Sequence, residues 1–149
     1  MKEKVRTIVC PVDFSSSSEE AARYAIGLAA QLGAARLDYV HVFQWPVYAV
    51  PEMGYYVDAG VEGSIKENLR RQLQTLGRRH SAHGVEIVTD LLEGTPHQAV
   101  VDHAESIRTN LIIIGTHGRT GLTHLLLGSV AEKVVRTSPI PVCTVRVPA

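Results

Sequence analysis

Residues 110–118 read Asn-Leu-Ile-Ile-Ile-Gly-Thr-His-Gly, and this stretch decides the fold. Its apolar run is continuous rather than alternating, which is typical of a central strand of a parallel sheet that is covered on both faces. Gly115 follows the run at once, and a glycine at the end of a strand lets the backbone approach a ligand without a Cβ in the way. The stretch therefore predicts a parallel α/β sheet with a ligand-binding loop at its edge.

On both sides of this stretch, strand-like segments alternate with segments of helical period. The expected strands cover residues 7–12, 36–43, 86–92, 110–114 and 142–147. The expected helices begin at Ser15–Ser18, after Gly63, at Thr95 and at Gly128-Ser129. This alternation predicts an α/β fold with a parallel sheet. One domain over residues 1–149 is expected, because a chain of this length suits a single hydrophobic core.

The boundaries and buried faces of three helices follow from their capping residues and from the periodicity of their apolar residues. In the first helix, serines 15–18 cap the start, Gly33 caps the end, and the expected buried stripe is Ala22, Ile26, Ala29 and Leu32. In the second, the expected stripe is Ile65, Leu69, Leu73 and Leu76, the basic run 78–80 is expected on a solvated face, and the helix stops near Gly84. In the third, Thr95 and Gln98 are expected to form a capping box around Pro96.

Composition excludes several classes of protein. Fifteen basic residues balance fifteen acidic ones, so no net field draws the chain to nucleic acid or to an anionic membrane. No apolar stretch approaches the roughly 20 residues of a spanning helix. The charged residues 1–6 do not resemble a signal peptide, so a cytoplasmic location is expected. Cys10 and Cys143 both fall in strand-like apolar runs and are expected to be reduced, buried thiols.

Two glycine sites bracket a short hydrophobic stretch after the fourth strand. The first is Gly115-Thr116-His117-Gly118-Arg119-Thr120-Gly121, and the second is Gly128-Ser129, which opens the last helix. Successive backbone N–H groups of a glycine loop can point at one anion, and a helix amino end supplies a second anion site. Together the two sites indicate that the protein binds a row of linked phosphates.

This spacing, Gly115-x-x-Gly118, nine residues, then Gly128-Ser129, resembles the ATP-binding signature of the universal stress protein family. Further anchors of the resemblance are Pro11-Val12-Asp13, His41-Val42, Gly94-x-Pro96 and Pro141-Val142, so it runs nearly end to end. It implies a doubly wound sheet of order 3-2-1-4-5 with helices on both faces. ATP, with Mg, is then expected over strands one and four, where open α/β sheets bind their ligands.

The resemblance also implies which residues form the site. Val12, Asp13 and Val42 are expected around adenine and ribose. Gly115, Gly118, Gly128, Ser129 and Val130 are expected at ribose and phosphates. The remaining expected contacts are Pro11, Gly94, Ile114, Thr116, His117 and Arg119. The resemblance assigns no catalytic residue and no protein ligand for a metal.

Four of these side chains have an alternative role. Asp13 either caps the first turn or binds ligand, although serines 15–18 already offer caps. The Ser129 hydroxyl serves either the ligand or a capping box with Glu132. His117, like Arg119, either adds positive charge near the phosphates or faces solvent.

Missing motifs exclude other nucleotide-dependent functions. The sequence has no Gly-x-x-x-x-Gly-Lys-Ser/Thr run and no Gly-x-Gly-x-x-Gly after the first strand, which excludes P-loop and dinucleotide sites. It also lacks the clustered carboxylates of a phospho-receiver domain and the Ser-Gly-Gly loop of pyrophosphatase-type enzymes. A regulatory, nucleotide-responsive stress protein with an unknown protein client is expected. The alternative is a slow ATPase or self-phosphorylating enzyme with His117 as a candidate base, and the nucleotide itself stays open between ATP, ADP and cyclic AMP.

Two further expectations concern surfaces. The stretch from Gln44 to Gly63 is long for a loop and rich in aromatics, so it covers either a ligand or partner, or packs as ordinary surface. Pro139 and Pro141 beside the last strand indicate a sheet edge. An uncovered edge exposes backbone N–H and C=O groups, and the resemblance implies that a second copy covers it to give a homodimer through the last strand.

Overall fold

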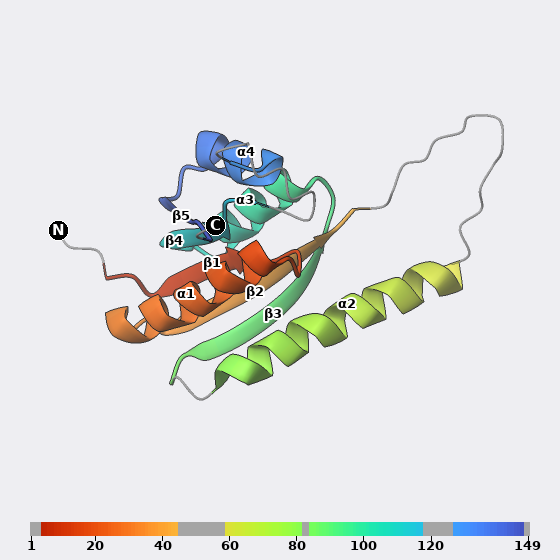
Figure 1. Ribbon diagram of the computed structural model, residues 1–149, viewed down its shortest axis with the longest axis horizontal. Helices are drawn as coiled ribbons and strands as arrows, with labels where there is room; N and C mark the ends of the chain where they lie inside the picture. The colour runs from red at the N-terminus through yellow and green to blue at the C-terminus, as the bar shows by residue number, and fades with distance from the viewer. Residues whose placement is uncertain (1–3, 45–58, 82–83, 118–126, 148–149) are drawn as a thin grey trace.

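The computed structural model describes residues 4–44, 59–81, 84–117 and 127–147, and the architecture below concerns these residues. The strands are β1 (Thr7–Pro11), β2 (Arg36–Phe43), β3 (Glu86–Glu93), β4 (Leu111–Gly115) and β5 (Val142–Val145). The helices are α1 (Ser16–Leu32), α2 (Ala59–His80), α3 (Pro96–Ser106) and α4 (Ser129–Thr137). Figure 1 shows them as a sheet between two helical layers.

All strand pairs are parallel, and the sheet has the order β3-β2-β1-β4-β5. One core cluster joins α1 and α2 to one face of the sheet, and a second joins α3 and α4 to the other. These findings confirm the expected doubly wound fold, its strand order, and an edge position for the last strand. That the domain spans all of residues 1–149 stays a prediction, because both ends lie outside the described residues.

Several predicted boundaries were wrong: among the strands, β1 ends at Pro11 instead of Val12, and β4 is Leu111–Gly115 instead of residues 110–114. Strand β5 ends at Val145 instead of residue 147, and helix α2 begins at Ala59, so residues 59–63 are helical and not part of a loop. Acidic Glu62 lies in the first turn of α2, where its negative charge interacts favourably with the positive end of the helix dipole. The aromatic residues predicted as a cover, within 45–58, lie outside the described residues. Helix α2 ends at His80, a little before the predicted stop.

Helix α1 begins and ends as its sequence predicts. The Ser15 side chain accepts a hydrogen bond from the Ser18 N–H, and Gly33 closes the helix in the left-handed conformation, with φ of 61°. Ala22, Ile26 and Ala29 are buried, but Leu32 is 42% exposed. The prediction for Leu32 was wrong because the periodic stripe continues into the last turn, where the core no longer covers it.

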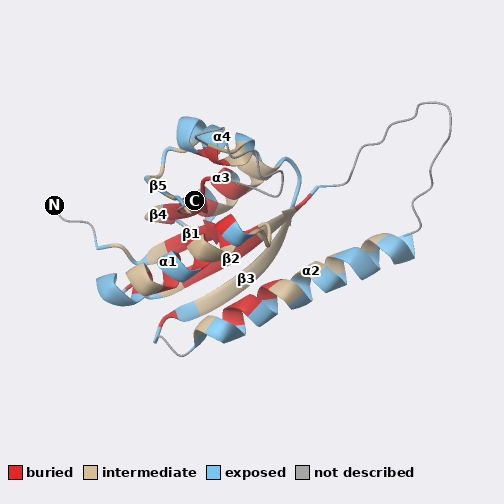
Figure 2. Ribbon diagram, in the orientation of Figure 1, coloured by how far each residue is buried: buried red, intermediate tan, exposed pale blue. Residues whose placement is uncertain are grey.

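The buried residues of helix α2 all lie in its C-terminal half, while its N-terminal half contacts the sheet through Lys66, which pairs with Glu93 and lies over the Phe43 ring. Leu73 and Leu76 are buried, whereas Ile65, predicted on the same stripe, is 41% exposed. In Figure 1 the helix runs on past β3, and Figure 2 shows its buried turns in the half nearer its carboxyl end. Periodicity identifies the apolar face of a helix but not the point at which the sheet beneath it stops.

The capping box predicted for α3 does not form. Thr95 occupies the N-cap position but makes no side-chain capping bond. The Gln98 amide instead donates to the Asp102 carboxylate one turn later, at 2.8 Å. Pro96 at the first helical position accounts for the start of this helix, since it has no N–H to be capped.

A hydrogen bond between two side chains connects α2 to the sheet beneath α1. Tyr39 of β2 is fully buried, and its hydroxyl donates to the Ala22 carbonyl at 3.0 Å. The same hydroxyl contacts Nδ1 of His80, and since its one proton is used, the ring nitrogen must donate. The prediction of a purely solvated face was therefore wrong for His80. Burial raises the pKa of the Tyr39 phenol, so the donor stays protonated.

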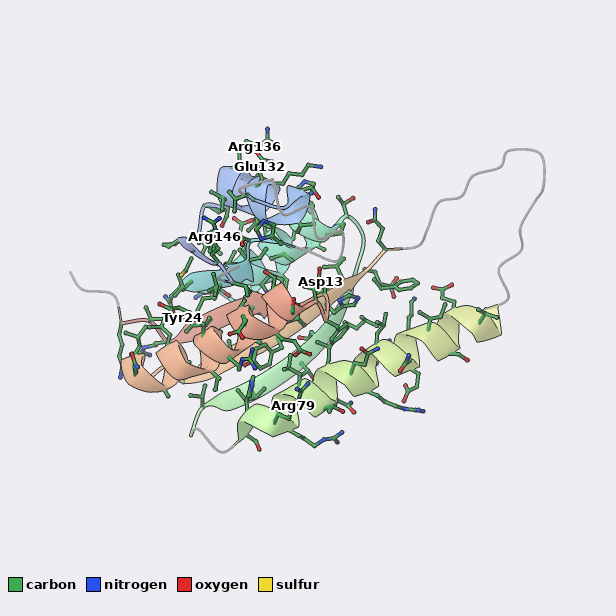
Figure 3. All side chains as sticks on the ribbon, in the orientation of Figure 1. Asp13, Tyr24, Arg79, Glu132, Arg136 and Arg146 are labelled. Carbon is green, nitrogen blue, oxygen red and sulfur yellow. The ribbon has the colours of Figure 1, made fainter. Side chains whose placement is uncertain are left out.

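We expect Tyr39→Phe to lower the free energy of unfolding by about 1–2 kcal/mol, because the Ala22 carbonyl and the His80 ring each lose a buried partner. Urea denaturation measures the difference. The matched control is Tyr24→Phe, which removes a hydroxyl from a side chain that is 50% exposed on α1 (Figure 3) and should change stability by less than about 0.5 kcal/mol. Equal effects at the two positions would contradict the assignment.

Across the described residues, none of the helices combines the length and the apolar character that crossing a membrane requires.

Candidate functional site

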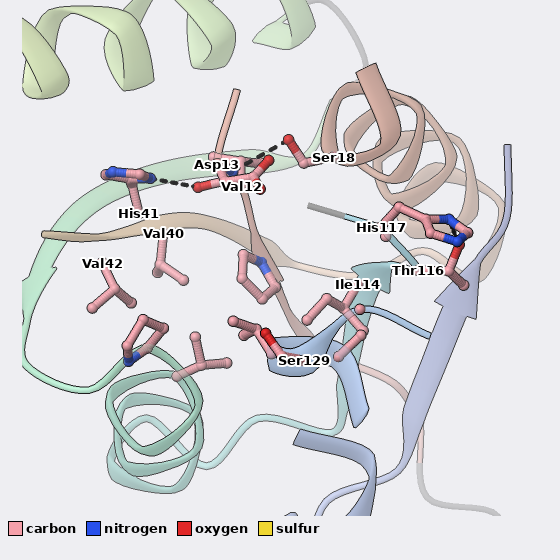
Figure 4. A pocket seen from close by; sticks show the side chains of 17 residues that line it. Val12, Asp13, Ser18, Val40, His41, Val42, Ile114, Thr116, His117 and Ser129 are labelled. Atoms are coloured by element: carbon pink, nitrogen blue, oxygen red, sulfur yellow. Dashed lines mark hydrogen bonds between the residues drawn. The ribbon is translucent and has the colours of Figure 1, made fainter. Parts of the chain in front are cut away.

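A pocket lies at the carboxyl ends of β1 and β4, where the strand order reverses (Figure 4). Its walls come from the end of β1 and the turn into α1, from β2, from the start of α3, and from β4 and the first turn of α4. Open α/β sheets bind ligands at such a crevice, because the connections on its two sides lead to opposite faces of the sheet.

The pocket brings together all but three of the residues that the sequence indicated. These are Pro11, Val12, Asp13, Val42, Ile114, Gly115, Thr116, His117, Gly128, Ser129 and Val130. Gly118 and Arg119 lie outside the described residues, and Gly94 is not among the lining residues. Their contacts with a nucleotide stay predictions.

Gly94 does not line the pocket but has a conformational role. Its φ of +122° is one that residues with a Cβ rarely adopt. Its N–H donates to the Phe43 carbonyl at 3.2 Å, which ties the turn after β3 to the end of β2. A glycine is therefore required here by the turn that leads into α3.

Six lining residues were not predicted: Ser18, Val40, His41, Pro96, Val100 and Ala131. The period of a strand places Val40 on the same face as Val42, and the period of a helix places Val100 one turn after Pro96. Those two signals were present in the sequence. That α3 faces β2 across the pocket depends on the tertiary fold and had no local signal.

Asp13 both anchors the turn after β1 and lines the pocket. Its carboxylate accepts hydrogen bonds from the Ser15 N–H, at 3.0 Å, and from the Ser15 hydroxyl. Its own N–H donates to the Ser18 hydroxyl at 3.2 Å. Serine 15, which the sequence indicated as the cap, thus caps α1 and holds Asp13 as well. One carboxylate oxygen is engaged in the turn while the residue faces the cavity.

The amino end of α4 opens on the pocket, and its N-cap residue supplies no side-chain cap. Gly128 is the N-cap residue, and Ser129 is the first residue of the helix. Of the two alternatives for Ser129, the capping box with Glu132 is therefore wrong, since the serine follows the N-cap residue. The Gly128 N–H donates to the Thr116 carbonyl, which joins this helix end to the end of β4.

Gly115 allows β4 to touch the first turn of α1. A Cβ built on it would meet the Ser17 carbonyl oxygen and hydroxyl, each at 2.8 Å. Just beyond, the His117 N–H donates to the Ser17 hydroxyl at 3.3 Å, and the His117 ring lies 3.0 Å from the Thr116 hydroxyl. This glycine is thus needed for close packing of a helix as well as for the loop that follows.

We expect Gly115→Ala to lower the free energy of unfolding by about 1–3 kcal/mol, because the first turn of α1 must shift to admit the methyl group. The control is Gly27→Ala within α1, where a Cβ meets nothing within 4 Å. That change should raise stability by about 0.5–1 kcal/mol, since alanine is the better helix former. Thermal and urea denaturation of both variants test the contrast, and a neutral Gly115→Ala would contradict the contact.

A cluster outside the pocket has the composition of a metal site but is already occupied by an ion pair. Ligand atoms of Asp38, Asp90 and His103 lie within 4.8 Å of one another. The Arg36 guanidinium, however, bonds both oxygens of the Asp38 carboxylate, one of them at 2.7 Å. Burial alone would raise the pKa of Asp38, but hydrogen bonds from Arg36 and His103 outweigh it and hold that pKa below its usual value. The cluster pins α3 to β2.

The pocket itself is mostly apolar, with a few polar groups on its walls. Among the described lining residues Asp13 is the one carboxylate, and the hydroxyls come from Ser18, Thr116 and Ser129. Mg²⁺ is commonly held by one or two carboxylates together with the phosphates of a ligand. The residues present therefore suit a Mg²⁺ ion that arrives on a nucleotide better than an ion held by the protein alone.

A five-stranded parallel sheet of this order, with a pocket at its reversal point, defines the doubly wound class of ligand-binding α/β proteins. The model of the universal stress protein family matches residues 4–146. The chain belongs to the universal stress protein family.

Relatives of known sequence and structure agree with this assignment. Universal stress protein MJ0531 of Methanocaldococcus jannaschii is 36% identical over 96% of this chain and 83% of its own length. The solved structure of MJ0577 from the same organism has a TM-score of 0.86 at 26% identity, over 99% of both chains. A universal stress protein solved in complex with cAMP has a TM-score of 0.71 at 25% identity, over 98% of this chain and 100% of its own.

Proposed function

We propose that this protein binds an adenine nucleotide, ATP with Mg²⁺, in the pocket between β1 and β4 and acts as a nucleotide-responsive regulatory protein. One observation carries the proposal: the carboxyl ends of β1 and β4 meet in one pocket with the amino end of α4, whose N-cap residue is a glycine. A helix amino end attracts anions through its free N–H groups and its dipole. The relative that was solved with cAMP supports an adenine nucleotide as the ligand.

The distribution of side chains supports an orientation for that ligand. The base lies in the apolar part, against Val40, Val42 and Val100, and the phosphates lie toward Ser129 at the start of α4. Asp13 lies between these ends of the site and faces the ribose. Polar groups at a few fixed points of an otherwise apolar pocket are the usual basis of ligand specificity.

A regulatory role fits this kind of site better than fast catalysis does. When bound, Mg²⁺ supplies charge neutralisation of the phosphates. The chain contributes backbone N–H groups and hydroxyls, which hold the nucleotide before and during any reaction alike. Such uniform binding gives affinity without a corresponding rate.

We expect Ser129→Glu to weaken the binding of Mg-ATP at least about tenfold, because it places a negative charge where the phosphates lie. The fold should persist, since an acidic residue is favourable in the first turn of a helix. Isothermal titration calorimetry measures the affinity. Ser129→Ala, which removes only the hydroxyl, should lose less.

The matched control is Ser16→Glu, because Ser16 is likewise the first residue of a helix, α1, but is exposed and does not line the pocket. It should bind Mg-ATP within about threefold of the parent, since its added charge is screened by solvent. A parent protein that takes up no adenine nucleotide would overturn the proposal. Equal affinity of Ser129→Glu and the parent would move the phosphates away from α4.

We further propose that the protein is a homodimer formed through β5. This strand pairs with β4 on one side and ends the sheet on the other. The carbonyls of Pro141 and Val145 accept bonds from β4 and from the residue after it, so the backbone groups of Thr144, one position away, face the open edge. Thr144 is exposed, and an unpaired edge of this kind is usually covered.

Thr144→Pro removes one outward N–H and leaves the bonds to β4 in place. We expect this variant to be a monomer at micromolar concentration, whereas Thr144→Val, which keeps the N–H, should remain a dimer like the parent. Multi-angle light scattering distinguishes the two masses. A monomeric parent would contradict the proposal.

A further inference from the structure

The turn between β1 and α1 contains a backbone conformation that is unfavourable for its residue. Phe14 has φ of +63°, in the left-handed region that bulky side chains seldom adopt. Such conformations cost free energy and persist only where neighbouring groups hold them in place, often at ligand sites. The residues just before it, Val12 and Asp13, line the pocket.

His41 of β2 holds the first part of this turn. The Val12 N–H donates to the Val40 carbonyl at 2.8 Å and extends the β1–β2 ladder beyond the end of β1. The next polar group, the Val12 carbonyl, lies 2.7 Å from Nδ1 of His41 (Figure 4). Because a carbonyl oxygen only accepts, Nδ1 must carry the proton.

The same ring holds the last part of the turn. Its centroid lies 4.9 Å from that of the Phe14 ring, and the two planes are tilted by 37°. His41 therefore contacts the residues on both sides of Asp13, while Ser15 and Ser18 hold Asp13 itself. We call the set of His41, Val12 and Phe14 the turn clamp.

We propose that His41 is a positioning residue of the nucleotide site, which acts through the turn clamp to present Val12 and Asp13 to the ligand. The inference rests on the proposed function of the pocket. The hydrogen bond fixes the direction of the Val12 peptide and so holds the turn that contains Phe14 in its unfavourable conformation, while the ring packs against the Phe14 side chain. Without that hydrogen bond, the Val12 peptide reorients and the ligand-facing groups of Val12 and Asp13 lose their preformed arrangement, which costs affinity.

Two substitutions separate the parts of the clamp. In His41→Asn the side-chain amide nitrogen takes the place of Nδ1, so the donor to Val12 remains while the ring is lost. In His41→Phe the ring remains against Phe14 while the donor is lost. If the hydrogen bond orients the site, His41→Asn should bind Mg-ATP within about threefold of the parent, and His41→Phe about tenfold more weakly, because an unsatisfied carbonyl lets the turn reorient.

Measurements on the ligand-free protein test the clamp independently of nucleotide binding. Nitrogen-15 NMR of the parent should show His41 with its proton on Nδ1. The amide resonance of Asp13, whose N–H shares a peptide with the Val12 carbonyl, should shift strongly in His41→Phe and little in His41→Asn. Urea denaturation of both variants measures any general loss of stability, which a purely structural role would make similar for the two.

The outcomes are distinct. Rescue of affinity by His41→Asn, together with the parent tautomer, supports the proposal. A His41→Phe variant that binds as tightly as the parent overturns it, and so do two variants that lose affinity equally in proportion to their stability. If the parent binds no adenine nucleotide but the amide shifts occur as expected, the proposed function fails while the clamp stands.

Discussion

The separation of β1 from β4 at their carboxyl ends is the constraint on which the site depends. The two strands pair at Ile8 with Leu111 and at Val9 with Ile112, and the ladder then stops. Since the Val12 N–H points to β2, the alternation of a strand directs the nitrogen of Pro11 toward β4. Proline has no hydrogen to donate there, so the ladder cannot continue. The crevice thus begins where the covalent structure of one residue forbids the next hydrogen bond.

Beside that crevice, a glycine and a serine hydroxyl make the close contacts between α1 and the end of β4. Gly115 lets α1 approach β4, and the Ser17 hydroxyl accepts the His117 N–H where the strand ends. The pocket wall therefore combines backbone at these close approaches with apolar side chains such as Val40, Val42 and Val100, on elements that are anchored in two apolar cores. Where the wall is backbone, as at Gly115, even a Cβ forces a neighbouring element to move.

Features set by neighbours in the chain could be predicted from the sequence. The Ser15 cap, the Gly33 cap and the buried run of β4 each depend on a few adjacent residues, and each is present. The strand order and most of the pocket residues followed from the family resemblance. That resemblance depends on a spacing of glycines, which local secondary-structure propensity does not explain. The pocket position of Ser129 was indicated correctly, whereas its role as a cap was not.

Features that depend on distant elements could not be predicted. Whether Leu32 or Ile65 is covered depends on where the sheet ends beneath each helix. Gln98 had two partners within reach, Thr95 and Asp102, and only the folded geometry decides between them. His41 was quoted as a family anchor, yet its contacts with Val12 and Phe14 require β2 to lie beside a turn nearly 30 residues away.

One residue at the end of β4 joins two parts of the structure. The Thr116 N–H donates to the Val145 carbonyl of β5, and its own carbonyl accepts from the Gly128 N–H at the head of α4. The outer strand and the helix end at the pocket therefore share Thr116 as a hydrogen-bonding partner. A partner on β5 and a ligand at the head of α4 would thus act on the same residue. If binding at one of these two places changes the binding free energy at the other, the change is the same in both directions.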